Sequence, residues 1–126
     1  ISVNPYDRGA ALKIARDLHQ LGFKLVATAG TGAALESVGL PVRVVNKVSE
    51  GSPNVVDALR NGEIDLMINT PRGGQAHLDG PQIRSAAHQF GVPLITTMTG
   101  AMAAVQGIRS LRQKPLRARS LQKHHA

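Results

Sequence analysis

The chain has 126 residues, 42% of them hydrophobic, which fits one globular domain and includes no apolar run long enough to cross a membrane. It has no cysteine, which excludes disulfides and thiolate metal sites, and no secretory signal pattern, so we expect a cytoplasmic location. The net charge of +7 comes from the C-terminal end, because residues 1–107 carry nine basic and eight acidic residues. Since the first residue is Ile1, we expect a domain cut from a longer protein.

Apolar patterns predict five strands that alternate with five helices. The expected strands are residues 1–3, 23–27, 42–45, 64–68 and 94–96. The expected helices are residues 10–21, an alanine-rich stretch after Gly32, and residues 54–60, 82–90 and 101–111. Ser52 is the expected N-cap of the helix at 54–60, with Pro53 as its first residue. Regular alternation with short connections predicts an α/β fold, a parallel sheet with helices on both faces.

The turn at residues 28–32, Thr-Ala-Gly-Thr-Gly, is the first candidate for a binding site. It follows a strand and precedes a helix, where unpaired backbone N–H groups attract an anion. It matches neither GxGxxG nor GxxxxGKS/T, so its own phosphate signal is weak. We therefore interpret it as a phosphate holder only together with the other strand ends.

Polar side chains follow all five predicted strands. In a doubly wound sheet, ligands bind beyond the carboxyl ends of the strands. The residues at those ends are Ser2, Arg8, Thr28, Gly30, Thr31, Asn46, Lys47, Asn69, Thr70, Thr96 and Thr97. Hydroxyls, amides and two cations suit a phosphate-bearing anion better than a metal. Each residue also has a purely structural interpretation: the threonines as helix caps, Lys47 as a solvated lysine, and Asn69–Pro71 as a turn.

Four segments in this order carry a family resemblance: LVATAGT, VNKVSEG, NGEIDLMINTP and IRSAA. Together they resemble the C-terminal regulatory domain of the carbamoyl-phosphate synthase large chain, a member of the methylglyoxal-synthase-like superfamily. The resemblance covers residues 2–105 and implies a five-stranded parallel sheet in a three-layer α/β/α sandwich, strand order 3-2-1-4-5. We accordingly expect a regulatory domain at residues 1–109 and a basic, flexible tail at 110–126.

The resemblance also implies a ligand. In bacterial members UMP, which inhibits, and IMP bind this domain. The matching phosphate-site residues are Ser2, Arg8, Thr28, Gly30, Thr31, Lys47, Asn69 and Thr70. This chain has Arg8 where the family has lysine, and Pro71 where it has threonine. Thr96 matches a threonine that contacts ornithine, although its neighbour Ile95 replaces a residue that is often acidic.

The resemblance further implies that the reaction belongs to the parent enzyme. That enzyme is an ATP-dependent ligase that forms carbamoyl phosphate for pyrimidine and arginine biosynthesis and uses ATP with Mg or Mn. The expected partners of this domain are a nucleotide effector, the catalytic body of the large chain and, through it, the glutaminase small chain. We expect no cofactor, metal or catalytic residue in the domain itself.

One alternative in the same superfamily is methylglyoxal synthase, a lyase that eliminates phosphate from dihydroxyacetone phosphate. Its mechanism requires a carboxylate base beside the phosphate. This chain has residues 51–55, Gly-Ser-Pro-Asn-Val, and Asn69–Pro71 where the synthase carries its two aspartates. Asp7 and Asp57 are the acids that remain near the predicted site, and we interpret His77 as solvent-exposed.

A second alternative, from another functional class, is a nucleic-acid-binding module. The segment after Gly107 carries six basic residues and no acid: Arg109, Arg112, Lys114, Arg117, Arg119 and Lys123. The chain contains only three aromatic residues, too few for a base-stacking surface, so we expect no nucleic-acid binding by the body of the domain. Binding through the tail predicts a steep salt dependence.

Overall fold

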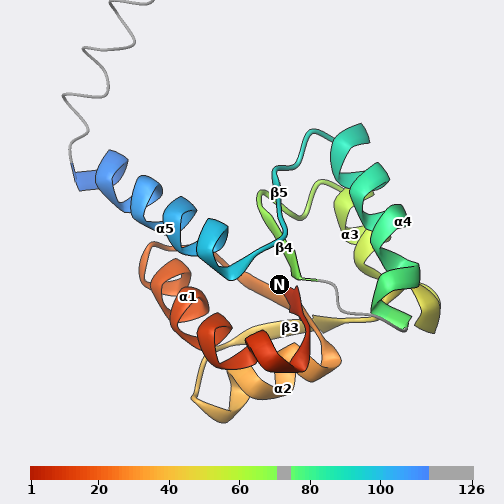
Figure 1. The fold of residues 1–126 in the computed structure, drawn as a ribbon, viewed down its shortest axis with the longest axis horizontal. Helices are drawn as coiled ribbons and strands as arrows, with labels where there is room; N and C mark the ends of the chain where they lie inside the picture. Colours follow the sequence, from red (N-terminus) through yellow and green to blue (C-terminus); the bar gives the residue numbers. More distant parts are fainter. Residues whose placement is uncertain (71–74, 114–126) are drawn as a thin grey trace, which may run out of the picture.

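Short parallel strands alternate with helices along the described chain (Figure 1). The computed structural model describes residues 1–70 and 75–113, with only the helical backbone for residues 75–79 and 113. The strands are β1 (Ser2–Val3), β2 (Leu25–Thr28), β3 (Val42–Val45), β4 (Met67–Thr70) and β5 (Leu94–Ile95). The α-helices are α1 (Arg8–Gln20), α2 (Ala29–Ser37), α3 (Val55–Arg60), α4 (Gln75–Gln89) and α5 (Met98–Gln113). Two 3-10 turns, η1 (Pro5–Asp7) and η2 (Val48–Glu50), complete the elements.

The strands form two parallel sheets, β1-β4-β5 and β2-β3, which lie side by side in the order 3-2-1-4-5. β3 pairs with β2, β1 with β4, and β4 with β5, all in parallel. Two hydrogen bonds join β1 to β2: the Ile1 nitrogen donates to the Val26 carbonyl at 2.7 Å, and the Thr28 N–H donates to the Ile1 carbonyl at 3.4 Å. The predicted parallel α/β sandwich and its strand order are confirmed.

Two apolar cores cover the two faces of this sheet. Ile68 belongs to the core beneath α1, α2 and α5, while its neighbour Met67 belongs to the core beneath α3 and α4. Adjacent strand residues point to opposite faces, so one strand supplies both cores. Helices therefore lie on both faces, which makes the three layers visible in Figure 1.

Several element boundaries differ from those predicted. α2 begins at Ala29, so most of the expected turn at residues 28–32 is helix. β4 begins at Met67 and includes the two polar residues that follow Ile68, because their backbones pair with β1. α4 begins at Gln75 and passes through Pro81, whose missing N–H costs one helical hydrogen bond. α5 runs from Met98 to Gln113, longer at both ends than expected.

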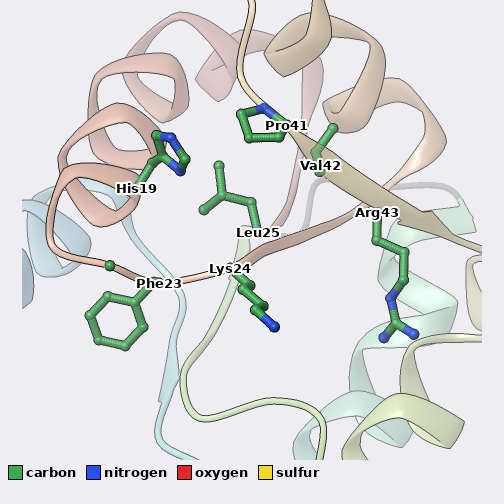
Figure 2. A pocket seen from close by; sticks show the side chains of 8 residues that line it. His19, Phe23, Lys24, Leu25, Pro41, Val42 and Arg43 are labelled. Atoms are coloured by element: carbon green, nitrogen blue, oxygen red, sulfur yellow. The ribbon is translucent and has the colours of Figure 1, made fainter.

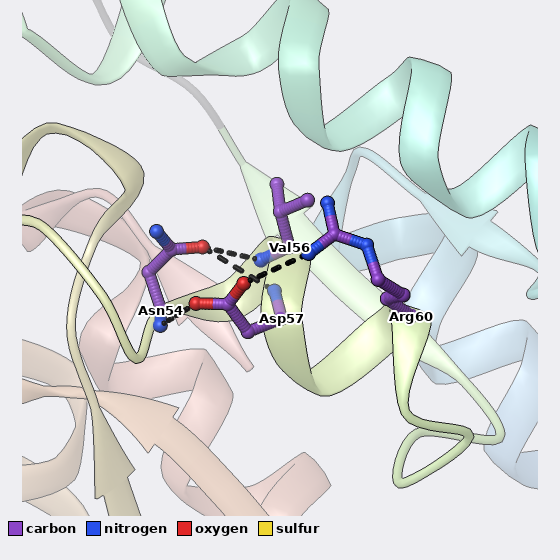
Figure 3. Close-up of polar contacts among 4 residues, drawn as sticks. All are labelled: Asn54, Val56, Asp57 and Arg60. Carbon is purple, nitrogen blue, oxygen red and sulfur yellow. Dashed lines mark hydrogen bonds and ion pairs between the residues drawn. The ribbon is translucent and has the colours of Figure 1, made fainter.

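The predicted cap of α3 was wrong. Asn54, not Ser52, is the N-cap, and α3 begins at Val55. The Asn54 side-chain oxygen accepts from the Val56 N–H at 2.9 Å, and the Asp57 carboxylate accepts from the Asn54 N–H at 2.8 Å (Figure 3). This reciprocal capping box provides acceptors for the N–H groups of Asn54, Val56 and Asp57. Ser52 lies farther upstream and is not the cap.

Candidate functional site

Four of the predicted site residues meet where β1, β2 and β4 end. Ser2 pairs with Asn69 in the β1–β4 register, and the Ile1 bonds place Thr28 on the other side of β1. The side chains of Thr28, Asn69 and Thr70 are buried, at 2%, 7% and 4% exposure. The carboxyl edge of the sheet is therefore lined by hydroxyl and amide groups.

Thr28 directs its hydroxyl toward β1 and leaves α2 uncapped. Its Oγ1 donates to the Ser2 Oγ at 3.0 Å, and Thr28 makes no side-chain cap to the helix that follows. Two hydroxyls that share one hydrogen bond keep one proton for another acceptor. This pair therefore retains one donor for an anion at the edge.

Thr31 fastens α2 to β1. Its Oγ1 accepts from the Val3 N–H at 3.1 Å and donates to the Val3 carbonyl at 3.4 Å, and its side chain is only 1% exposed. These bonds already use the hydroxyl proton, which the family resemblance assigns to the phosphate. What Thr31 still offers a ligand is its backbone N–H.

The N-terminus of α2 opens onto the same edge. Ala29, Gly30 and Thr31 form its first turn, and first-turn N–H groups have no acceptor within an α-helix. The backbone of Thr28 is extended, at φ −75° and ψ 164°, so the chain enters the helix directly from β2. The aligned peptide dipoles add a partial positive charge there, which favours an anion.

The guanidinium of Arg8 lies against this helix end. A Cβ placed on Gly30 would be 3.0 Å from Arg8 Cζ and closer still to Nη2. The Nε of Arg8 is buried and has no hydrogen-bond partner among the described residues. A cation with an unsatisfied buried donor beside a positive helix end is costly unless an anion joins them. Of the predicted site residues, Arg8 and Gly30, at the N-terminus of α2, are the ones whose arrangement most clearly favours an anion.

Asn4 is a residue of this site that the sequence interpretation missed. It was assigned only to a turn, but its N–H donates to the Thr70 Oγ1 at 3.2 Å and the Thr70 carbonyl at 3.1 Å. Its side chain exchanges two hydrogen bonds with Asp7, the residue just before Arg8. The signal in the sequence was the spacing Asn-x-x-Asp ahead of a helix, a capping pattern.

Lys47 and Thr96 lie at the same edge but farther out. Val45 pairs with Thr28, and Lys47 follows two residues later with its side chain half-buried. Its N–H donates to the Glu50 carboxylate at 2.7 Å, which fixes the turn η2. Thr96 directly follows β5 and is exposed. The structure thus leaves Lys47 and Thr96 at the flanks. It brings six predicted residues together at β1, β2 and β4, with Asn4 and Arg8 beside them: Ser2, Thr28, Gly30, Thr31, Asn69 and Thr70.

The two acids near the site are engaged in local structure. Asp7 accepts from Asn4 at 2.8 Å. A backbone hydrogen bond from Asn54, helped by Ser52 and Arg60, lowers the pKa of Asp57 although partial desolvation opposes it. A carboxylate with a lowered pKa is a weak general base. His77, which we interpret as solvent-exposed, and Pro71 lie outside the side chains that the structure describes.

A separate hollow of about 600 Å³ lies at the opposite, amino-terminal edge of β2 and β3 (Figure 2). Leu25, Pro41 and Val42 supply its apolar wall, and Lys24 and Arg43 project from the other side of the strands. Arg43 is paired with Glu63 at 2.9 Å. The hollow shares no residue with the carboxyl edge. Elsewhere in the described chain, no three His, Asp or Glu side chains gather as a metal site requires.

The sequence profile of the MGS-like domain matches residues 10–96. The chain belongs to the MGS-like domain family. The matched span runs from α1 to the residue after β5 and includes the Thr28–Gly30–Thr31 segment, Lys47 and Asn69. None of the helices in residues 1–70 and 75–113 combines the length and hydropathy that a membrane span requires.

Relatives of this MGS-like domain include carbamoyl phosphate synthase large chains. It is 49% identical over 99% of its length to the "Carbamoyl phosphate synthase large chain, C-terminal section" of Methanopyrus kandleri, and it covers 23% of that protein. It is 42% identical over its full length to the carbamoyl phosphate synthase large chain of Rhodopirellula baltica, and 44% identical over 97% to that of Synechocystis. It spans only 12% and 11% of the length of those two proteins.

Proposed function

We propose that this MGS-like domain binds the phosphate of a nucleotide effector at the carboxyl edge of its sheet. The observation that carries the proposal is the Arg8 guanidinium against the uncapped N-terminus of α2, since its buried Nε has no partner among the described residues. A phosphate oxygen there satisfies the guanidinium, the first-turn N–H groups and the remaining hydroxyl proton of the Ser2–Thr28 pair together. Lys47 and Asn69 supply further donors around the ligand.

In this proposal the domain is the regulatory end of a carbamoyl phosphate synthase large chain. Support comes from the relatives, which carry that name and match nearly the whole of the domain. The effector is UMP or IMP, and occupancy biases how the domain packs on the catalytic body by about 1–3 kcal/mol. ATP, its divalent metal, the ligase chemistry and the glutaminase chain belong to the rest of that cytoplasmic enzyme. Thr96, beyond β5, is the proposed contact with ornithine at the boundary to that body.

The same geometry favours sensing a phosphate over eliminating it. A lyase of this superfamily needs a positioned carboxylate of useful basicity. The capping box lowers the pKa of Asp57, and the Asp7 carboxylate accepts a hydrogen bond from Asn4. Release of methylglyoxal from dihydroxyacetone phosphate, followed by a colorimetric assay, tests the lyase alternative directly; turnover there would contradict a regulatory role.

The central test is a calorimetric titration of the full-length protein with UMP and with IMP. We expect one of them to bind, and Arg8→Ala to weaken that binding by at least about tenfold, the value of one charge-assisted hydrogen bond. Arg16→Ala is the matched control, since Arg16 is exposed on the same helix. Wild-type affinity in Arg8→Ala would overturn the site, and lack of binding by both nucleotides would overturn the effector class.

A further inference from the structure

Asn4 joins the end of β4 to the start of α1. Its backbone N–H donates to the carbonyl of Thr70 at 3.1 Å and to the Thr70 Oγ1 at 3.2 Å. Its side-chain Nδ2 reaches the same hydroxyl at 3.3 Å. The residue is therefore tied to the last position of β4 through main chain and side chain together.

The same Asn4 side chain also closes the turn that leads to Arg8. Nδ2 donates to the Asp7 carboxylate at 2.8 Å, and Oδ1 accepts from the Asp7 N–H at 3.1 Å. Since Arg8 is the next residue and the first of α1, this reciprocal pair fixes the point from which the Arg8 side chain starts. A side chain with many rotamers reaches one target reliably only when its backbone is held.

The target of Arg8 is held independently. Thr31 bonds both backbone groups of Val3, so the first turn of α2 keeps a fixed position relative to β1. β1 is in turn paired with β4, through Val3 and Thr70. Asn4 and Thr31 thus fix the two sides of the phosphate site, the guanidinium and the helix end, to the same pair of strands.

We propose that Asn4 is a positioning residue for the phosphate site, acting through Arg8 and without touching the ligand. This inference rests on the proposed function, because it assigns Asn4 a part in the same binding event. It predicts that the effect of Asn4 on affinity disappears when Arg8 is absent.

A double-mutant cycle in the full-length protein tests this coupling by calorimetry with whichever of UMP or IMP binds. We expect Asn4→Ala to weaken binding about tenfold in the wild type and less than about twofold in Arg8→Ala. The double variant N4D/D7N exchanges the amide and the carboxylate, keeps the reciprocal pair but loses the Nδ2 bond to Thr70, and should restore part of the affinity. Asn61→Ala, on the exposed end of α3, is the matched control. Equal losses in both backgrounds would overturn the proposal, since a merely structural role predicts additive effects.

A second measurement needs no nucleotide. Phenylglyoxal modification followed by peptide mass spectrometry reports how well Arg8 is shielded, with Arg16 in the same molecule as internal reference. We expect Asn4→Ala to raise the Arg8 rate several-fold and to leave the Arg16 rate unchanged. An unchanged Arg8 rate would contradict positioning by Asn4. If the wild-type protein binds neither nucleotide while Asn4→Ala raises the Arg8 rate, the effector proposal fails and the positioning role stands.

Discussion

At the scale of single residues, position 30 must be glycine for Arg8 to reach the N-terminus of α2, because the Arg8 guanidinium occupies the space of a side chain there. A methyl group there would lie 3.0 Å from Arg8 Cζ and closer to Nη2, so Gly30→Ala must push the guanidinium away from the α2 N-terminus. We expect nucleotide affinity to fall about tenfold or more, with little loss of folding stability, because alanine favours a helix. Gly9→Ala is the control, since no described atom beyond its chain neighbours and its own helix backbone lies within 4 Å of its Cβ position. Unchanged affinity in Gly30→Ala would separate Arg8 from the ligand.

Thr31 holds α2 against β1, and this structural role can be measured without a ligand. Thr31→Val removes both bonds to Val3 and leaves a buried N–H without a partner, which costs about 1–3 kcal/mol of unfolding free energy. Thr31→Ser keeps the hydroxyl and should lose less. Urea unfolding measures both, with the exposed Thr99→Val as control. A stable valine variant would show that the hydroxyl is free to serve the ligand instead.

At the scale of elements, apolar periodicity predicted the alternation of strands and helices, because buried faces impose that periodicity. The alternation in turn predicted the parallel sheet. The periodicity failed where tertiary contacts override local signals. The turn expected at residues 28–32 is helical from Ala29, since Thr31 is anchored by β1 and Gly32 packs against Val44. Asn69 and Thr70 were expected in a loop, but their backbones pair with β1. Six of the eight predicted phosphate-site residues meet at β1, β2 and β4, with Arg8 beside them and Lys47 farther out. The partner of the Thr31 hydroxyl and the role of Asn4 depend on distances that no local pattern contains.

The capping box of α3 gives this element a pH-dependent stability. Asn54 holds the pKa of Asp57 below its ordinary value, so the ionised carboxylate stabilises the fold above the unfolded pKa. That contribution is lost as the pH falls through the lowered, folded pKa. We therefore expect Asp57→Asn to be less stable than wild type at pH 7, and the difference to shrink below about pH 4. Urea unfolding at three pH values checks this, with the exposed Asp65→Asn as control; a difference independent of pH would contradict it.

The cap itself offers a companion measurement on the same helix. Asn54→Ala removes the side-chain acceptor for the Val56 and Asp57 N–H groups and should cost about 1 kcal/mol of unfolding free energy at every pH. Ser52→Ala should cost less, because Ser52 is not the cap. A larger loss from Ser52→Ala would restore the boundary predicted from the sequence.

At the scale of the whole molecule, two of the basic residues counted in the C-terminal segment belong to the fold. Arg109 and Asp17 form an ion pair at 3.3 Å, and Arg112 lies over the Phe23 ring, 5.2 Å from its centroid, while it donates to the Leu21 carbonyl. The last turns of α5 are thereby fastened to α1 and the loop after it. Charge counting alone places these cations with the tail, so it overstates the charge available to a polynucleotide.

This fastening predicts how the end of α5 responds to substitution. Arg112→Ala should lower the unfolding free energy by about 1 kcal/mol and speed amide hydrogen exchange in the last turn of α5, because the cation–π contact and the bond to Leu21 are lost together. Arg112→Lys should recover only part, since an ammonium lacks the planar face that stacks on Phe23. Gln106→Ala, exposed on the same helix, is the control. Faster exchange over all of α5 instead would mean that Arg112 holds the whole helix against α1, and unchanged exchange would mean that the Arg109–Asp17 pair alone suffices.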